Sequence, residues 1–123
     1  MQNKKFRFGP IALTTSVANL LNPGAASGGV NAGTPNLYIL LNHVRVVNKH
    51  ASTIAKVTSY IGATGASAAG TEAGFYLTPV PLGGSVDWYP VGLRLDVADF
   101  LTGTSDTSTA LTIEGEGEIG VAG

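Results

Sequence analysis

The segment that decides the fold is TALTIEGEGEIGV, residues 109–121. From Leu111 to Val121 every second residue is apolar or glycine, and the residues between them are Thr, Gly or Glu. A period of two residues is that of a β-strand and excludes a helix. A charged outer face is typical of an antiparallel sheet, since strands of parallel sheets are usually covered on both sides. Gly115 and Gly117, on the inner face, mark where an opposing sheet, a partner chain or a bulge comes close to the backbone.

We expect further segments of the chain to form strands that pair with this one. A turn at 48–52 joins two alternating segments, 37–48 and 53–61, and this pattern predicts a hairpin. Segment 13–21 fits either a strand or a short helical turn, 97–101 a helical turn, and 102–108 a polar loop. The other segments with strand composition are 4–13, 75–82, 85–89 and 93–96, of which 75–82 belongs at a sheet edge because it contains Pro79 and Pro81.

These segments predict an all-β fold, an antiparallel two-sheet β-sandwich or jelly roll of about seven to eight strands. Its core is expected on the apolar sides of the strands. The residues assigned to it are Val44, Val46, Val57, Ile61, Trp88, Leu93, Leu95, Leu111, Ile113 and Ile119.

Length and composition predict one domain with much of its surface covered by other protein. The 123 residues fit a single domain, residues 1–123, and only 12% of them are charged, against 44% that are hydrophobic. So little surface charge is unusual for a free monomer. Residues 1–8 are basic and are considered an N-terminal arm, and residues 22–36, NPGAASGGVNAGTPN, form a long loop. That loop is either a contact element or a plain surface excursion.

The charges are divided along the chain. Six of the seven basic residues precede residue 72, and all eight acidic residues lie from Glu72 onward, although the net charge is only −1. The basic residues are too scattered for a nucleic-acid face, with only Lys4, Lys5 and Arg7 close together. The sequence contains no cysteine, and we find neither a signal peptide nor a membrane-spanning stretch in it. We therefore expect a soluble protein with no membrane or nucleic-acid partner.

No residue pattern predicts catalysis or a cofactor. His43 and His50 lack a nucleophile–base motif and are expected to be surface or interface histidines. Glu114, Glu116 and Glu118, with Asp96 and Asp99 nearby, offer oxygen ligands of the kind that calcium takes. Three alternating glutamates are also the plain outer face of a strand, and this second interpretation is preferred. The sequence thus predicts no catalytic, cofactor-binding or metal-binding residues and no enzyme.

The aromatic residues allow two interpretations. Trp88 and Tyr89, with Tyr60 and Tyr76, have the chemistry of a carbohydrate-stacking platform. The preferred alternative places Trp88 in the core between the sheets, as a single large aromatic often is in a sandwich.

Four stretches together resemble small structural proteins of tailed-bacteriophage virions: HVRVVN at 43–48, YIGATG at 60–65, VDWY at 86–89 and the segment 111–121. The resemblance covers about residues 37–121. It implies a non-enzymatic β-sandwich that is made in the host cytoplasm and binds capsid or tail surfaces in many copies. The function expected is that of a decoration or cement protein on the major capsid protein, and the alternatives are a tail, connector or fibre component or a carbohydrate- or receptor-binding module.

Charge predicts which residues contact a partner. A basic N-terminal segment needs an acidic surface, which the glutamate stripe of the last strand, in this or another copy, or a virion protein would supply. The residues expected in such contacts, and in a homo-oligomer, are Lys4, Lys5, Arg7, Glu114, Glu116 and Glu118.

Overall fold

The computed structural model describes residues 3–21, 38–62, 71–96 and 99–120, so the loop expected at 22–36 lies outside the described residues. Within these ranges the chain forms nine strands and no helix, one or two strands more than expected. The strands are β1 (Asn3–Ala12), β2 (Ala18–Leu21), β3 (Tyr38–Asn48), β4 (Ala55–Gly62), β5 (Thr78–Val80), β6 (Ser85–Trp88), β7 (Leu93–Leu95), β8 (Phe100–Ser105) and β9 (Leu111–Gly120).

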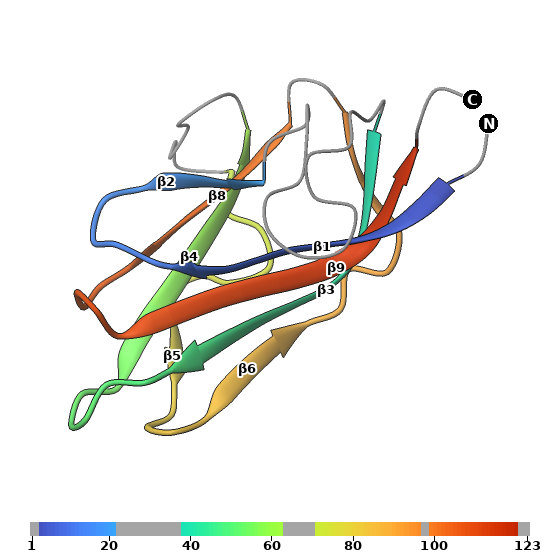
Figure 1. The fold of residues 1–123 in the computed structure, drawn as a ribbon. Coiled ribbons are helices and arrows are strands. Elements are labelled where there is room, and N and C mark those ends of the chain that lie inside the picture. Colours follow the sequence, from blue (N-terminus) through green and yellow to red (C-terminus); the bar gives the residue numbers. More distant parts are fainter. Residues whose placement is uncertain (1–2, 22–37, 63–70, 97–98, 121–123) are drawn as a thin grey trace.

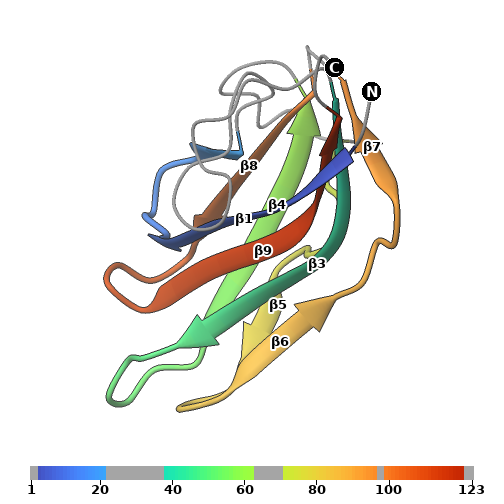
Figure 2. The ribbon, with the colours of Figure 1, turned by 45° about the vertical axis from the view of Figure 1, so that its right-hand side comes forward.

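The strands form two antiparallel sheets. Sheet A has the order β1-β9-β3-β6, with β7 also paired to β3, and sheet B has the order β2-β8-β4-β5. In Figures 1 and 2 the strands β1, β9, β3 and β6 lie side by side in one layer, with β8, β4 and β5 in the layer behind them. The prediction of an all-β, two-sheet antiparallel fold is confirmed. The segment 13–21, which was open between strand and helical turn, contains strand β2, and the proline-containing strand β5 lies at the edge of sheet B as expected.

Strand β9 is central to sheet A. It pairs along its whole length with β1 on one side and with β3 on the other. Its burial alternates as the sequence predicts, with Leu111, Ile113 and Ile119 buried in the core. A strand with two long partners and one buried face is fixed in register, because a shift by one residue would expose that face.

The inner glycines of β9 allow close packing. Gly115 pairs with Phe8, and a Cβ at Gly115 would overlap the Phe8 ring, so the aromatic side chain fills the space that glycine leaves. Gly117 lies opposite the irregularity of β3 between Leu41 and His43, where a Cβ would overlap the Leu40 carbonyl. The predicted close approach at both glycines is confirmed, and at Gly117 it accompanies a bulge.

The segment considered an N-terminal arm is part of the sandwich from Asn3 onward. Phe6 and Phe8 are buried, and β1 pairs with β9 from Asn3 to Ala12. The register of β1 shifts between Phe8 and Ile11, at a glycine, Gly9, whose φ is +76°. Only glycine adopts this conformation readily, so the sequence bends the edge strand here. Residues 3–8 are therefore a paired strand and not a free arm, because their two aromatic rings belong to the core.

The predicted hairpin between 37–48 and 53–61 is wrong. The first segment is β3 in sheet A and the second is β4 in sheet B, so the connection crosses between the sheets. Buried Asn48 fixes this crossing: its side-chain nitrogen donates to the carbonyls of Thr53 at 3.1 Å and Val80 at 2.9 Å. His50 has a structural role in the same turn, where Nδ1 accepts from the backbone N–H of Ser52 at 3.1 Å.

Strand β8 corrects two further expectations. The helical turn at 97–101 and the polar loop at 102–108 were predicted where the chain forms β8, with residues 97 and 98 outside the described part. This strand lies in the middle of sheet B, between β2 and β4. Thr102 and Ser105 are buried there, and the Ser105 hydroxyl donates to the Thr107 carbonyl at 2.7 Å. The Ser105 hydroxyl thus occupies a buried position because it is hydrogen-bonded, and a prediction from hydrophobicity alone does not detect such a position.

One hydrophobic core contains residues of both sheets. Of the ten residues predicted for it, seven are buried, and Ile61, Trp88 and Leu93 are half-buried against it. The core members that were not assigned in advance are Phe6, Phe8, Leu13, Leu20, Leu21, Ile39, Leu41, Ala55, Phe75, Val80, Leu101 and Ala110.

Candidate functional site

The outer face of sheet A carries most of the charged side chains that the fold brings together. We call it the charged face and define it by the outward residues of four neighbouring strands. In the order β1, β9, β3 and β6 these strands present a basic, an acidic, a basic and an acidic row. The rows are Lys5 and Arg7, then Glu114, Glu116 and Glu118, then His43 and Arg45, then Asp87.

The register places opposite charges beside each other. Arg7 pairs with Glu116, and Lys5 pairs with Glu118. Arg45 pairs with Glu114 on one side and with Asp87 on the other. Opposite charges directly across two strands stabilise a sheet modestly, by about 0.2–1 kcal/mol per pair. The division of charge along the sequence therefore becomes an alternation across the sheet, because basic strands from the first part of the chain lie beside acidic strands from the second part.

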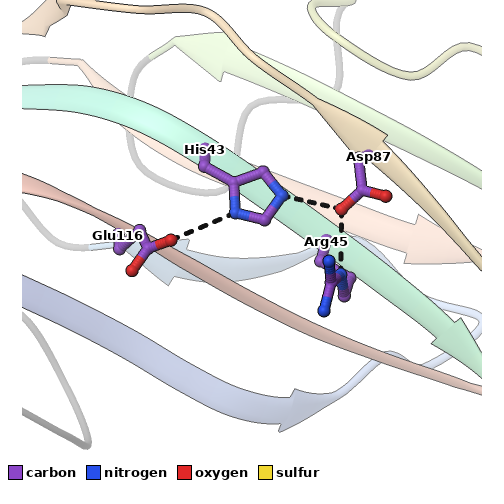
Figure 3. Close-up of polar contacts among 4 residues, drawn as sticks. All are labelled: His43, Arg45, Asp87 and Glu116. Carbon is purple, nitrogen blue, oxygen red and sulfur yellow. Dashed lines mark hydrogen bonds and ion pairs between the residues drawn. The ribbon is translucent and has the colours of Figure 1, made fainter.

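A hydrogen-bonded group joins the two rows at the β6 edge (Figure 3). One oxygen of Asp87, Oδ1, lies 2.7 Å from Nε2 of His43 and accepts from Nε of Arg45 at 2.9 Å. The hydrogen bond from His43, followed by that from Arg45, lowers the pKa of Asp87 below its ordinary value of 3.8. The same contact with Asp87 raises the pKa of Arg45. Asp87 is therefore held as a carboxylate.

His43 connects three strands. Its Nδ1 lies 3.2 Å from Oε1 of Glu116, on the opposite side of the ring from Asp87, as Figure 3 shows. The ring also stacks on Tyr89, with 4.6 Å between centroids and 15° between planes. An imidazolium donates from both nitrogens, whereas a neutral ring donates from only one. Both ring nitrogens of His43 face carboxylates.

Arg7 borders an open hollow on this face. The hollow has a volume of about 300 Å³ and is lined by Arg7, His43, Arg45, Glu114, Gly115 and Glu116. Arg7 is exposed and makes no hydrogen bond or ion pair to another described residue. In the part of the chain that the structure describes, no three His, Asp or Glu side chains converge as a metal site would require. The hollow is thus a polar depression between charged rows, suited to contact with another polar surface.

The residues expected to bind a partner lie mostly together. Five of the six are on the charged face, whereas Lys4 lies on the same side of β1 as Phe6 and Phe8, opposite to Lys5 and Arg7, and is exposed near the strand end. Arg45, Asp87 and Tyr89 were not among the residues expected from the sequence to bind a partner, and His43 was expected to be an ordinary surface or interface residue. The alternation of β3 was a usable signal for His43 and Arg45, but nothing local showed that β6 pairs with β3.

The four aromatic residues do not form one platform. Trp88 is half-buried and packs edge-on against Phe75, at 6.2 Å between centroids, on the core side of β6. Tyr89 is 64% exposed and lies on the charged face against His43. Trp88 packs against the core and Tyr89 against His43 on the charged face, so the two rings do not form one stacking surface. Trp88 was expected in the core between the sheets, and it is instead half-buried and packed against that core.

The fold and the charged face define a two-sheet β-sandwich with an ordered polar surface. The chain matches no protein family, no curated protein and no solved structure. Within the described ranges, no helix is long and apolar enough to cross a membrane.

Proposed function

We propose that this chain is a non-enzymatic structural protein of a bacteriophage virion, a decoration or cement protein that works in many copies on the capsid lattice. The observation that carries this proposal is the charged face, with its four rows of alternating charge. At the β6 edge of this face, His43 and Arg45 are both held by hydrogen bonds to Asp87. A fixed pattern of charges is suited to orienting a protein partner.

The charges supply orientation rather than most of the affinity. Exposed ion pairs contribute about 1 kcal/mol or less each. Apolar contact area is also available, because several large hydrophobic residues of the described part of the chain are exposed. They are Val47, Ile54, Tyr76, Leu77, Leu82, Tyr89 and Val91. A protein with 12% charged residues and these exposed side chains is expected to have part of its surface covered in its working state.

The proposal is tested by binding to particles. Capsids assembled without this chain are mixed with the purified protein, and bound protein is measured by sedimentation across a salt series. Arg7→Glu places a like charge opposite Glu116 and is expected to weaken binding, while Lys56→Glu, an exposed charge reversal on sheet B, is not. Binding of neither capsids nor purified tails by the parent protein would overturn the proposal, and binding to tails alone would favour a tail, connector or fibre component.

A further inference from the structure

We infer that the charged face binds the same face of a second copy of this chain, through a two-fold axis parallel to the strands and located between β9 and β3. This inference rests on the proposed function only in taking the charged face as a protein-binding surface. It names the partner and the orientation.

The order of the rows determines which axis is favourable. A two-fold axis along the strands reverses the strand order in the facing copy, so that β1 lies across from the partner's β6 and β9 lies across from the partner's β3. The order basic, acidic, basic, acidic read backwards is acidic, basic, acidic, basic. The acidic row of β9 then meets the partner's basic row on β3, and the basic row of β3 meets the partner's acidic row on β9. A two-fold axis across the strands keeps the order and places each row against its own sign, so that arrangement is disfavoured.

Residues that pair across neighbouring strands form a level of the sheet, and the levels that contain Glu116 and Glu114 support the pairing of β9 with the partner's β3. One level contains Arg7, Glu116, His43 and Tyr89 in strand order, as the pairing and the ring stacking show. In the proposed pair Glu116 lies across from the partner's His43. Arg7, which makes no hydrogen bond or ion pair to another described residue of its own chain, lies across from the partner's Tyr89, whose exposed ring can accept a cation–π contact.

The next two levels extend the contact. At the level of Glu114 this residue lies across from the partner's Arg45, while Asp87 lies across from an uncharged part of the partner's β1, whose register shifts at Gly9. The level beyond contains only uncharged residues, which are Ala12, Thr112, Val47 and Ser85 in strand order. Here Ala12 lies across from the partner's Ser85.

The contact ends toward β7. Arg94 of β7 pairs with Leu40, which pairs with Glu118, which pairs with Lys5. In the proposed pair Lys5 would lie across from the partner's Arg94, a like charge that is already bound to Asp96 at 2.8 Å. The interface is therefore confined to three levels, well below the size of a standard interface, and we expect a weak, salt-sensitive dimer that forms where copies are concentrated.

Crosslinking tests the orientation, because the chain contains no cysteine. Ala12→Cys and Ser85→Cys, both at exposed positions, are prepared separately and treated with a bismaleimide that spans about 10 Å, the spacing of packed sheets. We expect crosslinked dimers from the mixture of the two variants and none from either alone. Each variant crosslinking to itself would indicate the other axis. As a control, each variant is mixed with Lys56→Cys, whose cysteine lies on sheet B. A yield of crosslinked dimer from the Ala12→Cys and Ser85→Cys mixture that is no greater than in this control would also overturn the inference.

Sedimentation velocity tests the dimer itself. The parent chain is expected to dimerise at low salt and to dissociate as salt is raised, and Glu116→Lys is expected to remain monomeric. A parent chain that is monomeric at every salt and protein concentration contradicts the inference. If that chain still binds particles through the charged face, the proposed function stands and only the identity of the partner is wrong. If the chain dimerises through the charged face but binds no particle, the inferred dimer stands and the proposed function is wrong.

Discussion

Nε2 of His43 lies 2.7 Å from Oδ1 of Asp87, and this contact links two residues that are 44 positions apart in the sequence. It ties the edge strand β6 to β3 through side chains as well as through the backbone. Because Arg45 donates to the same oxygen, one carboxylate orders two residues of the basic row on β3. The charged face is thus an organised part of the sheet.

The first prediction concerns the pH dependence of this group. The pKa of Asp87 is lowered in the folded chain, so the ionised carboxylate stabilises the fold above its ordinary pKa of 3.8, and this contribution is lost as pH falls through the lowered value. Asp87→Asn should therefore be less stable than the parent at neutral pH, with a difference that shrinks in acid. Urea unfolding of both chains at neutral pH and at a pH below 3.8 measures this difference in stability. An equal difference at the two pH values would contradict the lowered pKa of Asp87.

The second prediction concerns the facing of β9. Ile113 is fully buried and Thr112, its neighbour, faces outward. Ile113→Ala should lower the free energy of unfolding by about 2–5 kcal/mol through lost burial and a residual cavity. Thr112→Ala, the matched control, should change it by less than about 0.5 kcal/mol. Denaturant unfolding of both variants decides the matter, and similar values for the two would show that the strand faces the other way.

The third prediction concerns the bulge opposite β9. At Gly117 an added Cβ would overlap the Leu40 carbonyl, a backbone atom that cannot move away without disturbing β3. Gly117→Ala is expected to cost about 1–3 kcal/mol, as overpacking does. At Gly84 the nearest atom to an added Cβ would be 3.3 Å away, on a proline ring. Gly84→Ala should therefore melt closer to the parent, and a reversed order in calorimetry would refute the close approach at Gly117.

The fourth prediction concerns the N-terminal residues. Deleting residues 1–8 removes Phe6 and Phe8 from the core, and loss of a buried Phe typically costs about 3–5 kcal/mol. Two such losses are comparable to the whole stability of a domain, about 5–15 kcal/mol. The truncated chain should therefore be largely unfolded by circular dichroism, whereas Lys5→Ala should retain the fold. A folded truncated chain would show that β1 is dispensable, as a free arm would be.

The sequence predicted the fold class where the alternation is long. Strand β9 and the second half of β3 have unbroken period-two patterns, and their inner faces lie in the core as expected. Strand β8 lacks this signal because its buried positions include threonine, glycine and serine. Local pattern therefore detects a strand only when its inner face is apolar.

Pairing was less predictable than strand identity. A turn-like connection between two alternating segments indicates a hairpin, but the buried side chain of Asn48 binds the backbone of the connection and of β5, and this fixes a crossing between sheets. The charged face depends on the same tertiary information. Glu116 and Asp87 approach His43 from strands β9 and β6, and no spacing in the sequence brings them together.

The most direct measurement of the proposed virion role is cryo-electron microscopy of virions purified from a phage whose genome is found to contain the coding sequence of this chain. The account predicts repeated densities on the capsid surface that each fit one two-sheet sandwich, at a regular position on the lattice. Virions that contain no copy of the chain, in the map and by mass spectrometry of the same preparation, would contradict it.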